Sequence, residues 1–258
     1  MEKKEIIYRK IDLLINKVDE FNIGDDFTNE VNRRRSKIPT PFKNDDELLK
    51  TFAYLIAYSQ NANSELVEQI LNSGSYDKAF ENFEINKVVN LNPCDIVDTH
   101  WEKMKGIRQQ AKIFHIVSLA RKLKTINSLN KLINEVKIPK EINTIEDIDE
   151  FWLGFDQLLK SLKHHKIPFF QSTTSLLHFL LESGYDCIKP DLVVMKVAKK
   201  LKVVEEVNGD KNFRKTVRMI QEYSLSRKVR PPVVDFYFLI DEGQRGAKKF
   251  VKPEFYQV

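Results

Sequence analysis

The chain has 258 residues, of which 42% are hydrophobic and 31% are charged, so it can bury a core as one large domain or as two smaller lobes. No apolar stretch approaches membrane-spanning length, and residues 1–5 lack the apolar region of a secretory signal, which predicts a cytoplasmic protein. The two cysteines, Cys94 and Cys187, lie far apart without CxxC spacing, which argues against a disulfide framework and against a zinc or iron–sulfur site.

The net charge of +5 and the isoelectric point of about 8.9 mildly favour a polyanionic partner. The basic residues gather in short segments at 32–37, 164–166, 196–202, 227–230 and 248–249. Any one of these segments is typical of a solvated surface. Several of them on one face would form a footprint for phosphates.

Hydrophobic periodicity predicts an all-α chain. Apolar residues recur at helical spacing over 48–56, 113–123 and 155–162. Near the C-terminus, two consecutive prolines from Pro231 are typical of the first turn of a helix. We therefore expect helices throughout, with a last helix packed on the C-terminal part of the chain.

Cap residues support this helical interpretation. Asn63 or Ser64 is suited to cap a helix that begins at Glu65. Gly74 and Gly184 stand where the C-termini of helices would be capped. Strand signals are few. The best of them is 202–204, and the end of a helix is the alternative interpretation of these residues.

Two loops are candidate boundaries between lobes. The loop 137–142 is the stronger, and the two prolines in 37–41 discourage helix at a second one. We predict one helical lobe over 45–140 and a second lobe made of 1–44 and 141–258. A cleft between two lobes is a common place for a ligand site.

The segment 166–174 reads KIPFFQSTT, after an amphipathic stretch over 152–162 and before an apolar run that ends at Gly184. This order predicts a helix, a tight turn that begins at Pro168, and a second helix that starts near Ser172. A helix N-terminus presents unpaired backbone N–H groups and binds phosphate without a charged side chain. The plain alternative is an ordinary loop followed by hydroxyl residues that only cap a helix.

Asp191 ends the sequence CIKPD, directly before a helix predicted over 192–201. Aspartate is among the best N-cap residues, so capping alone is one explanation for it. A fixed carboxylate also suits the cleavage of a glycosidic bond, because the sugar becomes cation-like as the base leaves. The two roles are compatible, since a helix N-terminus stabilises a negative charge.

The hairpin sequence and the aspartate after it resemble the helix-hairpin-helix (HhH-GPD) superfamily of base-excision DNA glycosylases, and the 3-methyladenine DNA glycosylases in particular. The similarity spans about residues 45–205. It implies two helical lobes with a cleft between them, a helix-hairpin-helix over 152–183 and an aspartate loop over 184–191. It also implies that the hairpin binds a DNA phosphate and that Asp191 is the catalytic residue.

The resemblance further implies a monofunctional enzyme. Superfamily members that also nick the strand carry a lysine nucleophile eighteen residues before the aspartate, and Thr173 stands at that position here. Threonine cannot form a Schiff base with an abasic sugar. The cysteine count excludes the iron–sulfur branch, and the spacing of Cys94, Cys187 and the five histidines disfavours the zinc-clasped 3-methyladenine glycosylases.

The hairpin departs from the usual superfamily pattern, which has glycines where Phe169 and Gln171 stand here. The aromatic hairpins of some 3-methyladenine glycosylases are more similar to it. The departure leaves open whether the hairpin binds a phosphate and a monovalent cation. The resemblance implies DNA contacts at His165, Lys166, Phe170, Gln171, Ser172, Thr173 and Thr174.

The segment 55–61 resembles the stretch that inserts a residue into the gap left by a flipped base. Gln60 or Asn61 would be this wedge, and ordinary polarity at a helix end is the alternative. The segment 101–112 resembles the glycine and basic helix of the same enzymes.

An extruded base needs aromatic partners for stacking. Tyr58 and Trp101 are our candidates for the base pocket, because Trp152 and Phe155 follow a core stripe.

We therefore predict a monofunctional DNA glycosylase that flips a damaged base and hydrolyses its N-glycosidic bond through Asp191, leaving an abasic site. An alkylated purine is the favoured substrate because its positive charge weakens the bond and suits an aromatic pocket. The expected partner is double-stranded DNA with a damaged base; no metal or organic cofactor, no membrane and no oligomer is expected. The alternatives are a non-catalytic nucleic-acid-binding protein on the same scaffold and an unrelated helical protein.

Overall fold

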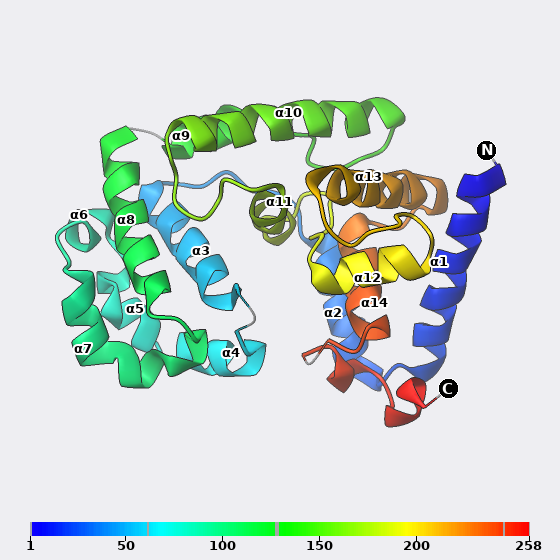
Figure 1. Cartoon of the computed structure of the whole chain (residues 1–258), viewed down its shortest axis with the longest axis horizontal. Helices are drawn as coiled ribbons and strands as arrows, with labels where there is room; N and C mark the ends of the chain where they lie inside the picture. Colours follow the sequence, from blue (N-terminus) through cyan, green and yellow to red (C-terminus); the bar gives the residue numbers. More distant parts are fainter. Residues whose placement is uncertain (1, 61, 127–128, 245, 258) are drawn as a thin grey trace. The chain divides into compact units, whose positions relative to one another are not determined.

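The computed structural model describes residues 2–60, 62–126, 129–244 and 246–257, and this part of the chain is all α-helical (Figure 1). Within it the only β pairing is an isolated antiparallel bridge between Asn22 and Val251. The predicted all-α fold class is thus confirmed. No helix in the described ranges is both long and apolar enough to cross a membrane.

The chain divides into two compact units. Unit 1 consists of residues 1–40, 138–153 and 173–258, and unit 2 of residues 41–137 and 154–172. Unit 1 contains α1 (Glu2–Phe21), α2 (Gly24–Ser36), α11 (Thr173–Glu182), α12 (Leu192–Lys200), α13 (Asp210–Arg227), α14 (Pro231–Asp241) and two short 3-10 helices, η3 (Lys248–Phe250) and η4 (Pro253–Tyr256). The helix α10 (Ile145–His164) contributes its first half to unit 1 and its second half to unit 2.

Unit 1 is organised around α14, which is buried along almost its whole length. Its aromatic residues Phe236 and Tyr237 lie in one apolar cluster with Val18 of α1 and Phe27 of α2. The rings of Phe27 and Tyr237 meet edge to face at 5.8 Å, an arrangement that aromatic pairs prefer. The N-terminal helices of the chain therefore complete the core around a C-terminal helix.

Unit 2 is a bundle of mostly short helices. It contains α3 (Asp45–Tyr58), α4 (Ser64–Asn72), α5 (Ser75–Ala79), η1 (Glu81–Phe83), α6 (Ile85–Val88), α7 (Pro93–Met104), η2 (Lys105–Ile107), α8 (Ala111–Ile126) and α9 (Leu129–Glu135). Tyr76, Phe80 and Phe83 are fully buried and form an aromatic cluster. The Tyr76 hydroxyl donates to the carbonyl of Ala53 in α3, which fixes α5 against the central helix α3.

The helix ends follow the sequence signals. The Asn63 side chain accepts a hydrogen bond from the Glu65 N–H and caps α4, and Gly74 and Gly184 take left-handed conformations with φ of 69° and 96°. Residues 202–204 form no strand and close the C-terminus of α12. The Val203 N–H donates to the Ala198 carbonyl across a left-handed Lys202. This closure is a Schellman motif without its usual glycine.

Lys112 of α8 is the one lysine among the described residues that is fully buried. Its Nζ donates to the carbonyls of Ala57 at 3.0 Å and Ser59 at 2.7 Å, so it caps the C-terminus of α3. Burial, and to a smaller degree the charge of Arg108, lowers the pKa of Lys112 to about 8. A cation at this place complements the helix dipole and the unpaired carbonyls.

The shifted pKa of Lys112 predicts a pH-dependent stability. The pKa is about 8 in the folded chain and ~10.4 in an unfolded one, so the unfolded chain binds more protons between these values and stability rises with pH there. We expect the free energy of unfolding of the wild type, relative to Lys112→Met, to increase from about pH 7 to about pH 9.5 in urea titrations.

Lys124→Met is the matched control, because Lys124 is an exposed lysine of the same helix. Its difference from the wild type should not follow the same trend. A pH-independent difference between the wild type and Lys112→Met would contradict the assignment of the shifted pKa to this residue.

Candidate functional site

Asp191 is the N-cap residue of α12, as the sequence predicts. Its Oδ1 accepts hydrogen bonds from the N–H groups of Val193 at 3.0 Å and Val194 at 3.2 Å. Its Oδ2 lies 3.6 Å from the Nζ of Lys189, and a quarter of the side chain is exposed (25%). One carboxylate oxygen is therefore fixed by the helix, while the other faces a cation at the surface of unit 1.

The loop 184–191 that carries Asp191 begins at a position that requires glycine. Gly184 has φ of 96°, and a Cβ built on it would lie 2.9 Å from the Ile38 carbonyl carbon and 3.1 Å from the Lys37 carbonyl oxygen. Glycine alone tolerates both this conformation and this close approach. The loop is thereby placed directly against the segment that follows α2.

A buried ion pair holds the first part of this loop. The Nε of Arg230 donates to Asp186 Oδ1 at 2.8 Å, and its terminal nitrogens donate to the carbonyls of Gly184 at 2.9 Å and Lys37 at 2.6 Å. Asp186 Oδ2 accepts from the Ile142 N–H. Burial raises the pKa of Asp186, against the opposing effects of the Ile142 N–H and of Arg230.

A buried amide holds the backbone at the same place. The Nε2 of Gln221 donates to the Asp186 carbonyl at 2.9 Å, and its Oε1 accepts from Trp152 Nε1 at 3.0 Å. Gln221 is fully buried and Trp152 nearly so. Trp152 is thus a core residue of unit 1, as its periodicity predicts.

A second buried ion pair holds the last part of the loop. Asp235 of α14, only 2% exposed, accepts from the Lys189 N–H at 3.1 Å and from the guanidinium of Arg34 at 3.0 Å. Arg34 also donates to Glu30, its neighbour on α2, at 2.7 Å. Nothing local in the sequence marks Arg34 and Asp235 as partners, since they are 201 residues apart.

The turn after α10, residues 165–172 of unit 2, has the backbone of a glycine-containing turn without its glycines. Lys166 has φ of 52° and Phe169 has φ of 73°. The Phe170 N–H donates to the Pro168 carbonyl at 2.9 Å across Phe169, which makes a γ-turn, a strained conformation for a residue with a side chain. The Gln171 side chain closes the turn by donating to the Ile167 carbonyl at 2.7 Å.

Two of the predicted DNA contacts have internal partners instead. Phe170 is fully buried, with its ring stacked on Phe52 of α3 at 4.1 Å, so its side chain belongs to the core of unit 2 and presents no atom to DNA. Thr173 is 5% exposed, and its hydroxyl donates to Asp210 of α13. These side chains stabilise the fold because each fills a packed position.

The other predicted hairpin contacts keep exposed surface. Ser172 and Lys166 are exposed, and His165, Gln171 and Thr174 are half-buried. Within the part of the chain that the structure describes, Lys166 and the exposed Lys163 of the last turn of α10 have no acidic partner.

In unit 2, the predicted wedge lies just beyond α3. Gln60 is exposed with φ of 54°, and Asn61 lies outside the described residues. The predicted pocket residues Tyr58 and Trp101 are both half-buried. Close packing explains the glycine of the segment 101–112, because a Cβ built on Gly106 would lie 2.7 Å from the Ile70 side chain of α4.

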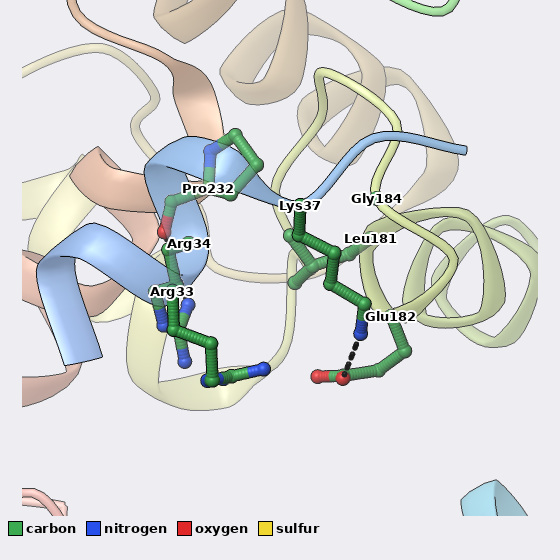
Figure 2. Close-up of a pocket in the computed structure, with 7 residues that line it drawn as sticks. All are labelled: Arg33, Arg34, Lys37, Leu181, Glu182, Gly184 and Pro232. Atoms are coloured by element: carbon green, nitrogen blue, oxygen red, sulfur yellow. Dashed lines mark hydrogen bonds and ion pairs between the residues drawn. The ribbon is translucent and has the colours of Figure 1, made fainter. Parts of the chain in front are cut away.

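Many cations of the basic segments are already paired within unit 1. Figure 2 shows the hollow lined by Arg33, Arg34 and Lys37, where the Lys37 ammonium reaches Glu182 at 3.6 Å. Arg33 binds Glu30, and Lys200 of α12 binds Glu242 at 2.7 Å. These ion pairs weaken the expectation that the basic segments add up to one phosphate footprint.

No group of three or more histidine, cysteine or acidic side chains in the described ranges is arranged to hold a metal ion. Cys187 is fully buried, and its thiol donates to the Leu177 carbonyl at 3.6 Å.

No family model and no curated protein matches the sequence. Two solved structures of 3-methyladenine DNA glycosylase I from Staphylococcus aureus, one a point mutant and one describing 3-methyladenine recognition, are similar to this structure. Each shows 20% sequence identity and a TM-score of 0.46, and covers 63% of this chain and 88% or 87% of its own. We assign no residue role from this likeness.

The left-handed backbone at Phe169 predicts that glycine is more stabilising than alanine at this position, the reverse of their order inside a helix. Phe169→Ala and Phe169→Gly both remove the ring, but only glycine adopts this φ without strain. We expect the glycine variant to be more stable than the alanine variant by ~1 kcal/mol in urea denaturation.

Gln157, an exposed residue inside α10, is the control position. There the alanine variant should be the more stable by ~0.5–1 kcal/mol. The same order at both positions would contradict the γ-turn.

Proposed function

We propose that the chain is a DNA glycosylase that hydrolyses the N-glycosidic bond of a damaged base with Asp191 as its catalytic residue. The observation that carries this proposal is the fixed and partly exposed carboxylate of Asp191. Two backbone N–H groups hold one of its oxygens, and buried side chains hold the loop before it.

The proposed chemistry needs a negative charge at a fixed place. As the base leaves, the sugar becomes oxocarbenium-like, and an anion beside it stabilises that state most when it is already positioned. Oδ2 of Asp191 also serves as an acceptor that orients or deprotonates the attacking water. In both roles the carboxylate stands at the N-terminus of α12, the positive end of the helix dipole.

The proposed enzyme leaves an abasic site without nicking the strand. Thr173 stands where the lyases of the resembling superfamily have an amine. Lys189, whose amine lies 3.6 Å from the Asp191 carboxylate, is the residue to test for the alternative lyase chemistry, which needs an amine nucleophile.

For DNA binding we propose the helix-hairpin-helix over residues 152–183. It would place the N-terminus of α11 toward a phosphate, with Ser172 and Thr174 as hydroxyl donors. Lys163, at the end of α10, and Lys166, in the turn, have no acidic partner among the described residues. A purine that carries a positive charge from alkylation is the proposed substrate, and Tyr58 and Trp101 are the proposed stacking partners.

A non-catalytic nucleic-acid-binding protein is the second candidate. It is favoured by the capping role of Asp191 and by the strained, glycine-free turn at Phe169. It predicts DNA binding of the same kind and no excision.

The catalytic proposal predicts that Asp191→Asn abolishes excision. Asparagine still accepts the two N–H bonds through its Oδ1 but carries no charge, so we expect base excision to fall at least ~100-fold with the fold intact. The assay incubates duplex DNA treated with a methylating agent, then heats it in alkali to convert abasic sites into breaks.

Asp241→Asn is the matched control, because Asp241, the last residue of α14, lies outside the loop and forms an ion pair with the exposed Lys200 of α12. Breaks that persist with Asp191→Asn would refute the catalytic role, and DNA binding without breaks in the wild type would favour the second candidate. Breaks without alkali, with an enzyme–DNA adduct trapped by borohydride and lost in Lys189→Met, would show lyase chemistry.

The hairpin proposal predicts a change in the salt dependence of DNA binding. Each phosphate contact contributes about 0.9 to the slope of log affinity against log salt concentration. We therefore expect Lys163→Gln/Lys166→Gln to lower the magnitude of this slope by about 2 in binding titrations.

Lys3 and Lys10 of α1 give a charge-matched control, because neither has an acidic partner in the described structure. The same loss of slope in Lys3→Gln/Lys10→Gln would show a general charge effect in place of a hairpin contact.

A further inference from the structure

We propose that Asp235 and Arg34 form a buried positioning pair that sets the place of the Asp191 carboxylate, and that neutralising Asp235 releases the aspartate loop. The pair touches the backbone of the loop and not the reacting atoms, so both are positioning residues. The catalytic consequence rests on the proposed function, whereas the control of the loop does not.

The geometry connects Asp235 to Asp191 through a very short piece of backbone. Asp235 Oδ1 accepts the N–H of Lys189 at 3.1 Å. The Lys189 carbonyl in turn accepts the Asp191 N–H at 2.8 Å, and the ring of Pro190 restricts the residue between them. Any displacement of the Lys189 backbone therefore moves Asp191 with it.

Arg34 fixes the other side of Asp235. Its guanidinium donates to Asp235 Oδ2 and to the Pro232 carbonyl, both at 3.0 Å, and lies over the Phe236 ring at 5.1 Å. Its side chain is 13% exposed and that of Asp235 is 3% exposed. Arg34 of α2 thus fixes one oxygen of the Asp235 carboxylate, and the other oxygen of this carboxylate binds the loop.

A purely structural role explains this arrangement poorly. A buried ion pair costs desolvation on both partners, and apolar residues of similar size stabilise a core as well or better. The carboxylate does what an apolar residue cannot do, because it accepts the otherwise unpaired N–H of Lys189 inside the protein.

The charge of Asp235 is sensitive to pH near neutrality. Its charged and titratable neighbours are Arg34 and, through it, Glu30 of α2, with Cys187, Lys189 and Asp191 of the loop. Burial raises the pKa of Asp235 to about 6; the Asp191 charge adds to this, and Arg34 and the Lys189 N–H oppose it.

As the pH falls through 6, Asp235 takes up a proton, so Arg34 keeps only Glu30 as its counter-charge and the Lys189 N–H is left with a weaker acceptor. The loop should therefore loosen on acidification.

The test measures hydrogen exchange of the peptide that contains the Lys189 amide in the full chain, as a protection factor corrected for intrinsic exchange. In the wild type we expect protection to fall roughly tenfold as the pH drops below about 6. Asp235→Asn should remove this step, and Asp241→Asn should keep it.

The double variant Arg34→Met/Asp235→Asn removes both charges, so no unpaired charge is left in the core. We expect it to keep the urea midpoint of the wild type and to lose protection of the Lys189 amide roughly tenfold. In the excision assay it should lower kcat without changing DNA affinity.

Protection unchanged in the folded double variant, or a pH step that survives in Asp235→Asn, would overturn the proposal. If a variant does not fold, the wild-type protein alone still tests the proposal, because protection of the Lys189 amide that does not fall below about pH 6 would contradict it. Loss of protection in a protein that excises no base would refute the proposed function and leave the positioning pair standing.

Discussion

The candidate site depends on one constraint, the need of a buried loop for polar partners. Loops normally run over the surface because their backbone groups must be hydrogen-bonded, yet Asp186, Cys187 and Ile188 are buried. Arg230 neutralises Asp186 of the loop and donates to the Gly184 carbonyl, and Arg34 neutralises Asp235, which accepts the Lys189 N–H. Without a guanidinium, each buried carboxylate would be an unpaired charge costing several kcal/mol, so the loop, its carboxylates and the two arginines form one unit.

The turn after α10 has an unfavourable backbone that is likewise held by contacts of buried and half-buried side chains. Lys166 and Phe169 take left-handed backbone conformations that cost ~1–2 kcal/mol for a residue with a Cβ. The stacking of Phe170 on Phe52 and the hydrogen bond of the Gln171 side chain hold the turn in place. Strain of this kind persists where the surroundings over-determine the backbone and is common at functional sites. The turn therefore forms without a glycine.

The helices and their caps could be predicted from the sequence because they depend on local spacing, and Asn63, Gly184 and Asp191 act as caps where they were expected. The supports of the site could not. Arg34 and Asp235 are 201 residues apart, and nothing local marks either as buried. A DNA contact at Phe170 follows only from the resemblance of the hairpin to the superfamily's turn, whereas its ring stacks on Phe52, far away in the chain, in the core of unit 2.

The capping of α12 and the proposed catalysis use different oxygens of one carboxylate. Because Oδ1 is held by two N–H groups, the carboxylate cannot rotate freely, and the direction of Oδ2 is fixed. The Lys189 ammonium lies 3.6 Å from Oδ2, which is longer than a hydrogen bond, so it leaves that oxygen's acceptor position open. Capping therefore supplies the preorganisation that the proposed stabilisation of a cationic sugar requires, and the structural role of Asp191 is part of the proposed catalytic one.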